Sequence, residues 1–192
     1  MDMFTLMTKA ASNISLTVTS MLESQTEKIV EISNLFTMTL KNGGTVFWCG
    51  NGGSSSESSH LATELIGRYK SNRRSLPSIS LSADTTAITC IANDFGYDEI
   101  FSRQLSGLGR PGDLLIVLST SGQSPNIVKV LKTAKYMGIK SVALLGKGGG
   151  LSKNLADLEV IVPSQETARI QEIQLMLGHS LCEIAEINLG IA

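Results

Sequence analysis

The sequence has few cysteines and almost no excess charge, and both shortages narrow what the protein can be. Its three cysteines are widely spaced and form no C-x-x-C pair, which favours a reduced, cytoplasmic protein. Lys and Arg number 16 and Asp and Glu number 17, so the formal net charge is −1. Nucleic-acid binding needs a basic surface, and we therefore expect no nucleic-acid partner.

Long apolar runs and targeting signals are also missing. The longest uninterrupted aliphatic run, residues 114–118, is far too short to span a bilayer, so we expect no membrane partner. The start, Met1-Asp2-Met3-Phe4, lacks the basic and apolar regions of a secretory signal. With 192 residues, 42% of them hydrophobic and 17% charged, the chain predicts one domain, 1–192, with a core of its own.

The first forty residues are typical of a helix. Their apolar residues recur at helical spacing, and no glycine or proline interrupts them before Gly43. This apolar stripe is wide enough to pack on a partner. We predict a helical segment over 1–42, used in packing or oligomerisation, followed by an α/β core over 43–192.

Short apolar runs and helical patterns alternate through the rest of the chain. The runs read as parallel strands that are covered on both faces, and they lie at 45–49, 78–81, 113–118, 141–145 and 158–162. Helical patterns are found at 55–69, 85–91, 100–108, 126–137 and 167–189, with loops at 146–150 and 163–164. The alternation predicts a single doubly wound, Rossmann-like parallel sheet of five strands flanked by helices.

Two turns of small residues follow two of these strands. Residues 49–56 read Cys-Gly-Asn-Gly-Gly-Ser-Ser-Ser, and residues 119–124 read Ser-Thr-Ser-Gly-Gln-Ser. Backbone N–H groups and hydroxyls at a strand end and helix start favour an anion, so the turns indicate a small phosphorylated ligand, although serines also serve as local caps. A dinucleotide site is disfavoured because Ser55 stands at the third glycine position of the motif G-x-G-x-x-G that begins at Gly50. A P-loop is excluded because no Gly-Lys-Ser/Thr follows the first turn.

The sequence contains only two histidines, and both accompany groups that could share their chemistry. His60 and Glu64 are four residues apart on a predicted helix, and His179 lies in the last predicted helix two turns after Gln171. A histidine on such a helix is often only a satisfied core residue. A carboxylate base, an imidazole and a phosphate grip together describe an aldose–ketose isomerase that works through an enediol.

Seven segments, in order along the chain, resemble the sugar isomerase (SIS) domain family. They are Cys49-Gly50-Asn51-Gly52-Gly53-Ser54, His60-x-x-x-Glu64-x-x-Gly67-Arg68-Tyr69, Asn93-Asp94-Phe95-Gly96, Phe101-Ser102-Arg103-Gln104, Ser119-Thr120-Ser121-Gly122-x-Ser124, Gly146-Lys147-x-Gly149-Gly150, and Thr167-Ala168-Arg169-Ile170-Gln171-Glu172 with His179. The resemblance implies isomerisation of D-sedoheptulose 7-phosphate to D-glycero-D-manno-heptose 7-phosphate, the first step of heptose synthesis for lipopolysaccharide or related glycans.

The resemblance also implies roles for individual residues. Glu64 would be the general base between C1 and C2, and His179 would be its acid/base partner. Phosphate would be held by Ser119, Thr120, Ser121 and Ser124, and the sugar by Asn51, Gly52, Gly53, Ser54, Glu64, Asn93, Asp94 and Gln171. Zinc would be bound by His60, Glu64, Gln171 and His179. The family implies a homotetramer with active sites between subunits, where Arg68 reaches a neighbour's site.

Helix geometry constrains the implied zinc set. Gln171 and His179 are eight residues apart, about 12 Å along one helix axis, so they reach one ion only if both side chains are fully stretched or come from different chains. Glu57 stands where relatives often carry Asp, and Gln174 where a histidine is common. Two alternatives stay open: a non-catalytic SIS protein that binds a replication initiator, and an isomerase of another phosphosugar. A sugar-phosphate-sensing regulator of this family would carry an N-terminal DNA-binding domain, for which the first forty residues are too few and not basic.

Overall fold

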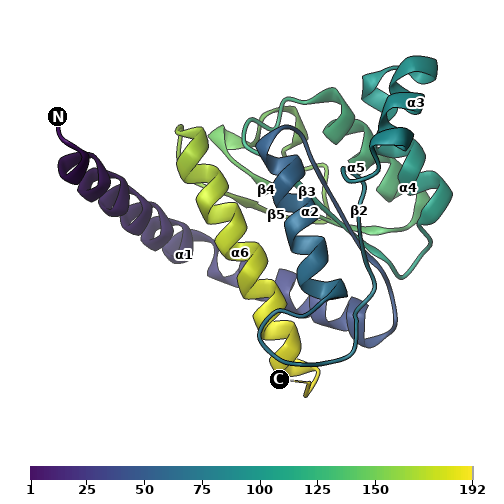
Figure 1. Cartoon of the computed structure of the whole chain (residues 1–192), viewed down its shortest axis with the longest axis horizontal. Coiled ribbons are helices and arrows are strands. Elements are labelled where there is room, and N and C mark those ends of the chain that lie inside the picture. The colour runs from purple at the N-terminus through teal and green to yellow at the C-terminus, as the bar shows by residue number, and fades with distance from the viewer. Residues whose placement is uncertain (192) are drawn as a thin grey trace.

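The computed structural model describes residues 1–191 and has three layers, with a parallel sheet between two layers of helices (Figure 1). The strands within these residues are β1 (Val46–Gly50), β2 (Ser78–Ser80), β3 (Leu114–Ser119), β4 (Lys140–Leu145) and β5 (Leu158–Ile161). Their order across the sheet is β2-β1-β3-β4-β5, and every neighbouring pair is parallel. The chain thus builds outward from β1 to β2 and then returns to add β3 on the other side of β1.

The helices divide between the two faces of the sheet. One face is covered by α1 (Met3–Lys41), α2 (Gly53–Ile66) and α6 (Thr167–Asn188). The other face carries α4 (Ser102–Leu108) and α5 (Pro125–Met137), with α3 (Thr85–Phe95) at its margin. Two short 3-10 segments complete the chain: η1 (Tyr97–Glu99) lies between α3 and α4, and η2 (Lys147–Ser152) lies between β4 and β5.

Alternation along the strands builds a separate core on each side of the sheet. Val46 and Trp48 of β1 pack with α1, α2 and α6, whereas Phe47 and Cys49 pack with α4 and α5. All five residues of β1 are buried, as are all six of β3. This two-sided burial explains why the strands read as continuous apolar runs in the sequence.

Helix α1 is about 58 Å long, and its two halves are packed differently. Its second half packs on the sheet, and Gln25 pairs with both backbone groups of Ile161 at 2.8 and 2.9 Å, which closes the edge strand β5. Its first half extends away from the sheet (Figure 1) and exposes a row of large apolar side chains, Met3, Phe4, Leu6, Met7 and Leu16. Within the described residues, none of the helices has the length and apolarity needed to cross a bilayer.

The predicted fold class is confirmed, including the long N-terminal helix and the five parallel strands. Most boundaries differ by one to four residues; helix α3, for example, runs to Phe95 and not to the expected residue 91. Helix α2 starts at Gly53 and ends at Ile66, before the expected end at residue 69, because the chain leaves the helix at Gly67. The expected loop at 146–150 is a tight 3-10 segment whose glycines take left-handed backbone angles.

Candidate functional site

The two small-residue turns lie side by side because β1 and β3 are neighbours in the sheet. Each turn follows the carboxyl end of its strand, and β1 pairs with β2 on one side and with β3 on the other. The strand order therefore reverses between them, which is where open α/β sheets bind their ligands. The predicted common crevice has the topology it needs.

A pair of amides joins the two turns. Asn51 in the first turn and Asn126 at the start of α5 each donate a hydrogen bond to the other's side-chain oxygen, both at 2.9 Å. Asn126 is only 1% exposed, and the Tyr97 hydroxyl donates to the same Asn51 oxygen at 3.0 Å. Asn51 is therefore held by its neighbours, and its position depends on two residues, Asn126 and Tyr97, that the sequence analysis missed.

The second turn, residues 119–124, contains hydroxyl groups that accept hydrogen bonds from its own backbone. The Ser119 oxygen accepts the Gly122 N–H at 3.0 Å, and the Ser121 oxygen accepts the Gln123 N–H at 3.2 Å. A hydroxyl that accepts in this way still has its own proton to donate to an anion. Ser124 precedes α5 as its N-cap, yet its side chain makes no capping bond to that helix. Ser124 thus makes no local capping bond, and its ligand role stays a prediction.

The glycine-rich segment η2 packs closely against the backbone of this turn. Gly122 has φ of 63°, and a Cβ on it would collide with the Gly149 carbonyl. A Cβ on Gly150 would meet the Ser121 carbonyl oxygen at 2.5 Å, and Ser152 donates through both its N–H and its hydroxyl to the Gly122 carbonyl, each at 2.9 Å. The two backbones therefore approach closely, which explains the glycines of η2.

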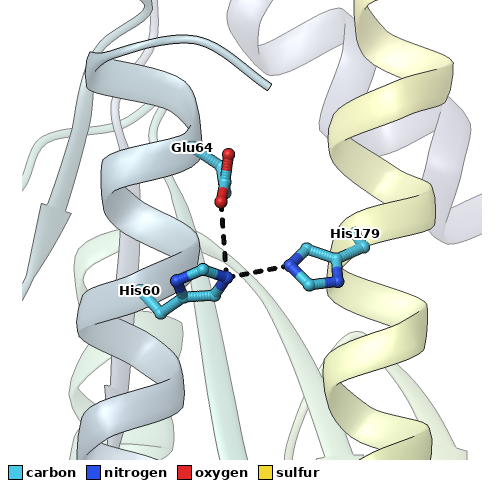
Figure 2. A group of neighbouring side chains, drawn as sticks. All are labelled: His60, Glu64 and His179. Carbon is cyan, nitrogen blue, oxygen red and sulfur yellow. Dashed lines mark hydrogen bonds and ion pairs between the residues drawn. The ribbon is translucent and has the colours of Figure 1, made fainter. Parts of the chain in front are cut away.

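The titratable cluster lies elsewhere, on the seam between α2 and α6 (Figure 2). The His60 Nε2 atom is 3.3 Å from Glu64 Oε1 and 2.9 Å from His179 Nε2. His60 is half-exposed and Glu64 is largely covered, with side-chain exposures of 48% and 19%. The expectation that His60 and Glu64 share a helix face is met, and a residue 119 positions away joins them.

An aromatic ring that the sequence analysis did not single out for function holds His179 from its other side. Tyr69, just beyond α2, stacks on the His179 imidazole with ring centroids 5.5 Å apart and planes 24° apart. His60 meets the same imidazole edge-on at 5.1 Å. The His179 ring is thereby enclosed between Tyr69 and His60. Tyr69 is part of the motif His60-x-x-x-Glu64-x-x-Gly67-Arg68-Tyr69, but spacing in the sequence alone could not predict that its ring contacts His179 on α6.

The remaining predicted residues fall into separate groups. The Gln171 side chain packs directly against Gly53, at the start of α2 and seven residues before His60. Ser54 is buried in the first turn of α2, and Gly52 is its N-cap with φ of 57°. The other three are exposed: Arg68 lies beyond the end of α2, and Asn93 and Asp94 lie on α3.

The His60 cluster has the donor set of a metal site. One ligand atom from each of His60, Glu64 and His179 lies within 4.8 Å of the other two. Imidazole nitrogen and carboxylate oxygen are usual zinc ligands, and bonds of about 2.0–2.2 Å would require such a spacing. These three residues therefore fit a metal ion.

Comparison with known proteins agrees with this geometry. A family model described as SIS domain matches residues 11–146. The chain belongs to the SIS domain family. A phosphoheptose isomerase of Akkermansia muciniphila is 48% identical over 165 residues, which cover 86% of this chain and 87% of the relative. One of Aliarcobacter butzleri is 44% identical over 174 residues, which cover 91% and 92%.

Two solved structures of phosphoheptose isomerases are also similar to the chain. The structure of a phosphoheptose isomerase from Francisella tularensis superposes with a TM-score of 0.90 at 31% identity, covering 96% of this chain and 98% of that one. The enzyme from Neisseria gonorrhoeae gives 0.83 at 34% identity, covering 94% and 98%. Within the SIS family, the chain is thus a member of the phosphoheptose isomerase group.

Proposed function

We propose that this chain interconverts D-sedoheptulose 7-phosphate and D-glycero-D-manno-heptose 7-phosphate, a ketose and an aldose. One observation carries the proposal: a carboxylate, Glu64, and an imidazole, His179, meet at one point on the α2–α6 seam. That is the acid/base equipment an enediol isomerase needs. The names of the relatives at 44–48% identity supply the substrate class.

The reaction moves one proton between neighbouring carbons. Glu64 removes a proton from C1 of the ketose and returns it to C2 of the enediol. His179 gives a proton to the C2 oxygen and takes one from the C1 oxygen, so no redox partner is needed. The hydroxyls of Ser119, Thr120, Ser121 and Ser124 hold the phosphate and fix the sugar for this transfer. Asn51, Gly52, Gly53, Ser54, Asn93, Asp94 and Gln171 complete the proposed sugar contacts.

We further propose that each active site is shared between copies of the chain. Glu64 lies eleven residues after Gly53 on α2, about 16 Å along the helix axis from the small-residue turns. An extended heptose 7-phosphate is shorter than that. A second copy could bring its Glu64 and His179 to the turns of the first, with Arg68 also reaching across.

Apolar surface on α1 supports such an assembly, which we propose to be a homotetramer. The first half of α1 exposes large apolar side chains. Its second half forms with α6 an apolar hollow of about 200 Å³, lined by Ile29, Val30, Ile32, Leu177, Leu181 and Ile184 among others. Burying both would favour association. Residues 1–42 would thus serve oligomerisation, and 43–192 would form the α/β core of one SIS unit.

Zinc is the metal that we propose for the cluster. His60, Glu64 and His179 would hold it, and Gln171 from another copy could add an amide oxygen. When bound, the ion would polarise the substrate's carbonyl and hydroxyl oxygens. The protein's own groups would still supply orientation and proton transfer. Cysteine usage supports the cytoplasmic location that we propose.

The proposed reaction is tested by proton NMR of sedoheptulose 7-phosphate in D₂O with the purified protein. We expect the aldose to appear with deuterium at C2, and Glu64→Gln to lower the rate by about 10²-fold or more. Full turnover by Glu64→Gln would contradict the assignment of the base. No conversion by folded protein, with and without zinc, would favour a sugar-phosphate sensor.

Co-expression tests the shared site separately. Glu64→Gln and a Thr120→Ala, Ser121→Ala double variant each damage a different half of the site. If the halves come from different copies, mixed oligomers contain some intact sites and regain activity. Mixed oligomers that stay as inactive as the two parents would show that each site is built from one chain.

A further inference from the structure

A buried ion pair lies about two turns along α6 from the titratable cluster. Arg73 Nε donates to Glu186 Oε1 at 2.8 Å, and both side chains are only 2% exposed. Arg73 follows α2, and Glu186 lies two turns after His179 on α6. A charge pair in such a place costs desolvation energy, so its hydrogen bonds need to be complete.

Glu186 anchors the segment that carries Tyr69. Its carboxylate accepts the backbone N–H groups of Tyr69, Lys70 and Ser71, each at 3.1 Å, besides the Arg73 bond. Burial by itself raises the pKa of this carboxyl, but these donors outweigh it and hold the pKa below its ordinary value. The carboxylate therefore stays ionised and keeps four donors gathered around it.

Arg73 fixes the end of the helix that carries Glu64. Its guanidinium donates to the Glu64 carbonyl at 2.7 Å and to the Leu65 carbonyl at 2.8 Å. These carbonyls lie in the last turn of α2, where backbone acceptors lack helical partners. One cation thereby closes the helix end at the backbone of the proposed base itself, Glu64.

Tyr69 connects this anchor to the site. Its backbone N–H is held by Glu186, and its ring stacks on His179, whose Nε2 faces His60 Nε2 at 2.9 Å. The chain of contact therefore runs from Glu186 through Tyr69 to the imidazole. Neither Glu186 nor Arg73 belongs to the titratable cluster.

We propose that Arg73 and Glu186 are positioning residues of the isomerase, which act through Tyr69 to hold the His179 imidazole opposite His60 and Glu64. The kinetic part of this inference rests on the proposed function, whereas the structural part does not. A shift of about 1 Å in a reacting group can cost about 10²-fold in rate, so a positioning role has a measurable effect.

Glu186→Gln is the sharpest perturbation because it keeps the volume of the side chain. Its amide would place a new donor against N–H groups that now point at a carboxylate oxygen. Glu183→Gln is the matched control, since Glu183 lies one turn earlier and pairs with Lys70 at the surface, at 2.6 Å. We expect Glu186→Gln to lower kcat by about tenfold or more, and Glu183→Gln to leave it unchanged.

Histidine-selective ¹³C labelling gives a readout that does not depend on activity. The chain has only two histidines, so the spectrum of the metal-free protein contains few ring signals. Tyr69→Leu should remove the ring-current shift of the His179 signals, and Glu186→Gln should move them the same way. His179 signals that stay in place in folded Glu186→Gln protein would overturn the proposal, even if no substrate were turned over.

A double variant separates action through Tyr69 from general damage. If Glu186 acts through Tyr69, the Glu186→Gln, Tyr69→Leu double variant loses no more activity than the worse of the two single variants. A loss equal to the product of the two single losses would contradict this route. If Glu186→Gln fails to fold, Tyr69→Leu still decides, because unchanged His179 signals and kcat in that variant would refute the stacking role. Tyr69→Phe keeps the ring and should behave as the wild type.

Discussion

Gly178 sets the distance between the two helices that carry the cluster, and Gly178→Ala tests this. A Cβ on Gly178 would lie 2.5 and 2.6 Å from the two terminal methyl carbons of Leu61, which is fully buried on α2. These residues are the direct neighbours of His179 and His60. The methyl group can be accommodated only if α2 and α6 move apart or Leu61 repacks.

Two opposing effects decide the size of the change. Alanine in place of glycine inside a helix stabilises by about 0.5–1 kcal/mol. Overpacking a tight core costs about 1–3 kcal/mol, so we expect a net loss of about 1–2 kcal/mol. Catalysis should suffer more, because the 2.9 Å approach of the two imidazoles would open. A misplacement of about 1 Å corresponds to about 10²-fold in kcat.

Urea denaturation and steady-state kinetics measure the two effects separately. Gly107→Ala is the control, since Gly107 lies in α4 with no atom within 4 Å of its ideal Cβ, and it should gain about 0.5–1 kcal/mol. Adding Leu61→Ala makes room and should cost less in the Gly178→Ala background than alone. A Gly178→Ala enzyme that is stabilised like Gly107→Ala and keeps its full kcat would refute this reasoning.

Three further outcomes are expected. Ser121→Ala should raise KM for the phosphosugar and leave kcat nearly intact, because it removes the proposed hydrogen bond to the phosphate; an unchanged KM would count against the proposed phosphate site. Asn126→Ala should lower stability by about 1–3 kcal/mol, measured in urea, since it removes both hydrogen bonds between the buried Asn126 and the half-buried Asn51 amide. The pKa of Glu186 is lowered in the folded protein, so the ionised carboxylate contributes stability at pH values above its ordinary pKa of 4.5. This contribution is lost as the pH falls through the folded-state pKa, so the melting temperatures of wild type and Glu186→Gln should converge in acid.

The fold was predictable because burial on both faces leaves a direct mark on the sequence. Strand β3 is a run of apolar residues since each face meets a different helical layer, and its alternate residues belong to different cores. Helical spacing likewise placed His60 and Glu64 on one face of α2. These are local relations, and periodicity reports local relations well.

The missed residues all act across long separations. Asn126 reads as a residue of an ordinary helix start, yet it pairs with Asn51, 75 residues earlier. Glu186 reads as an exposed acid on an amphipathic helix, although Tyr69, 117 residues away, donates to it. Their polar side chains carry no periodic signal that identifies the partner. Only packing determines which polar groups meet.

The register of α2 against α6 bears on the zinc set that the family resemblance implies. The helices run in the same direction (Figure 1) and stay in step: Gly53 faces Gln171, and His60 faces His179. Residues seven apart on one helix thus meet residues eight apart on the other. Gln171 therefore lies about two turns from His179 along the seam, about 12 Å along the helix axis. A ligand set with both residues favours two chains at each site, where Gln171 beside one copy's turns meets the imidazoles of another.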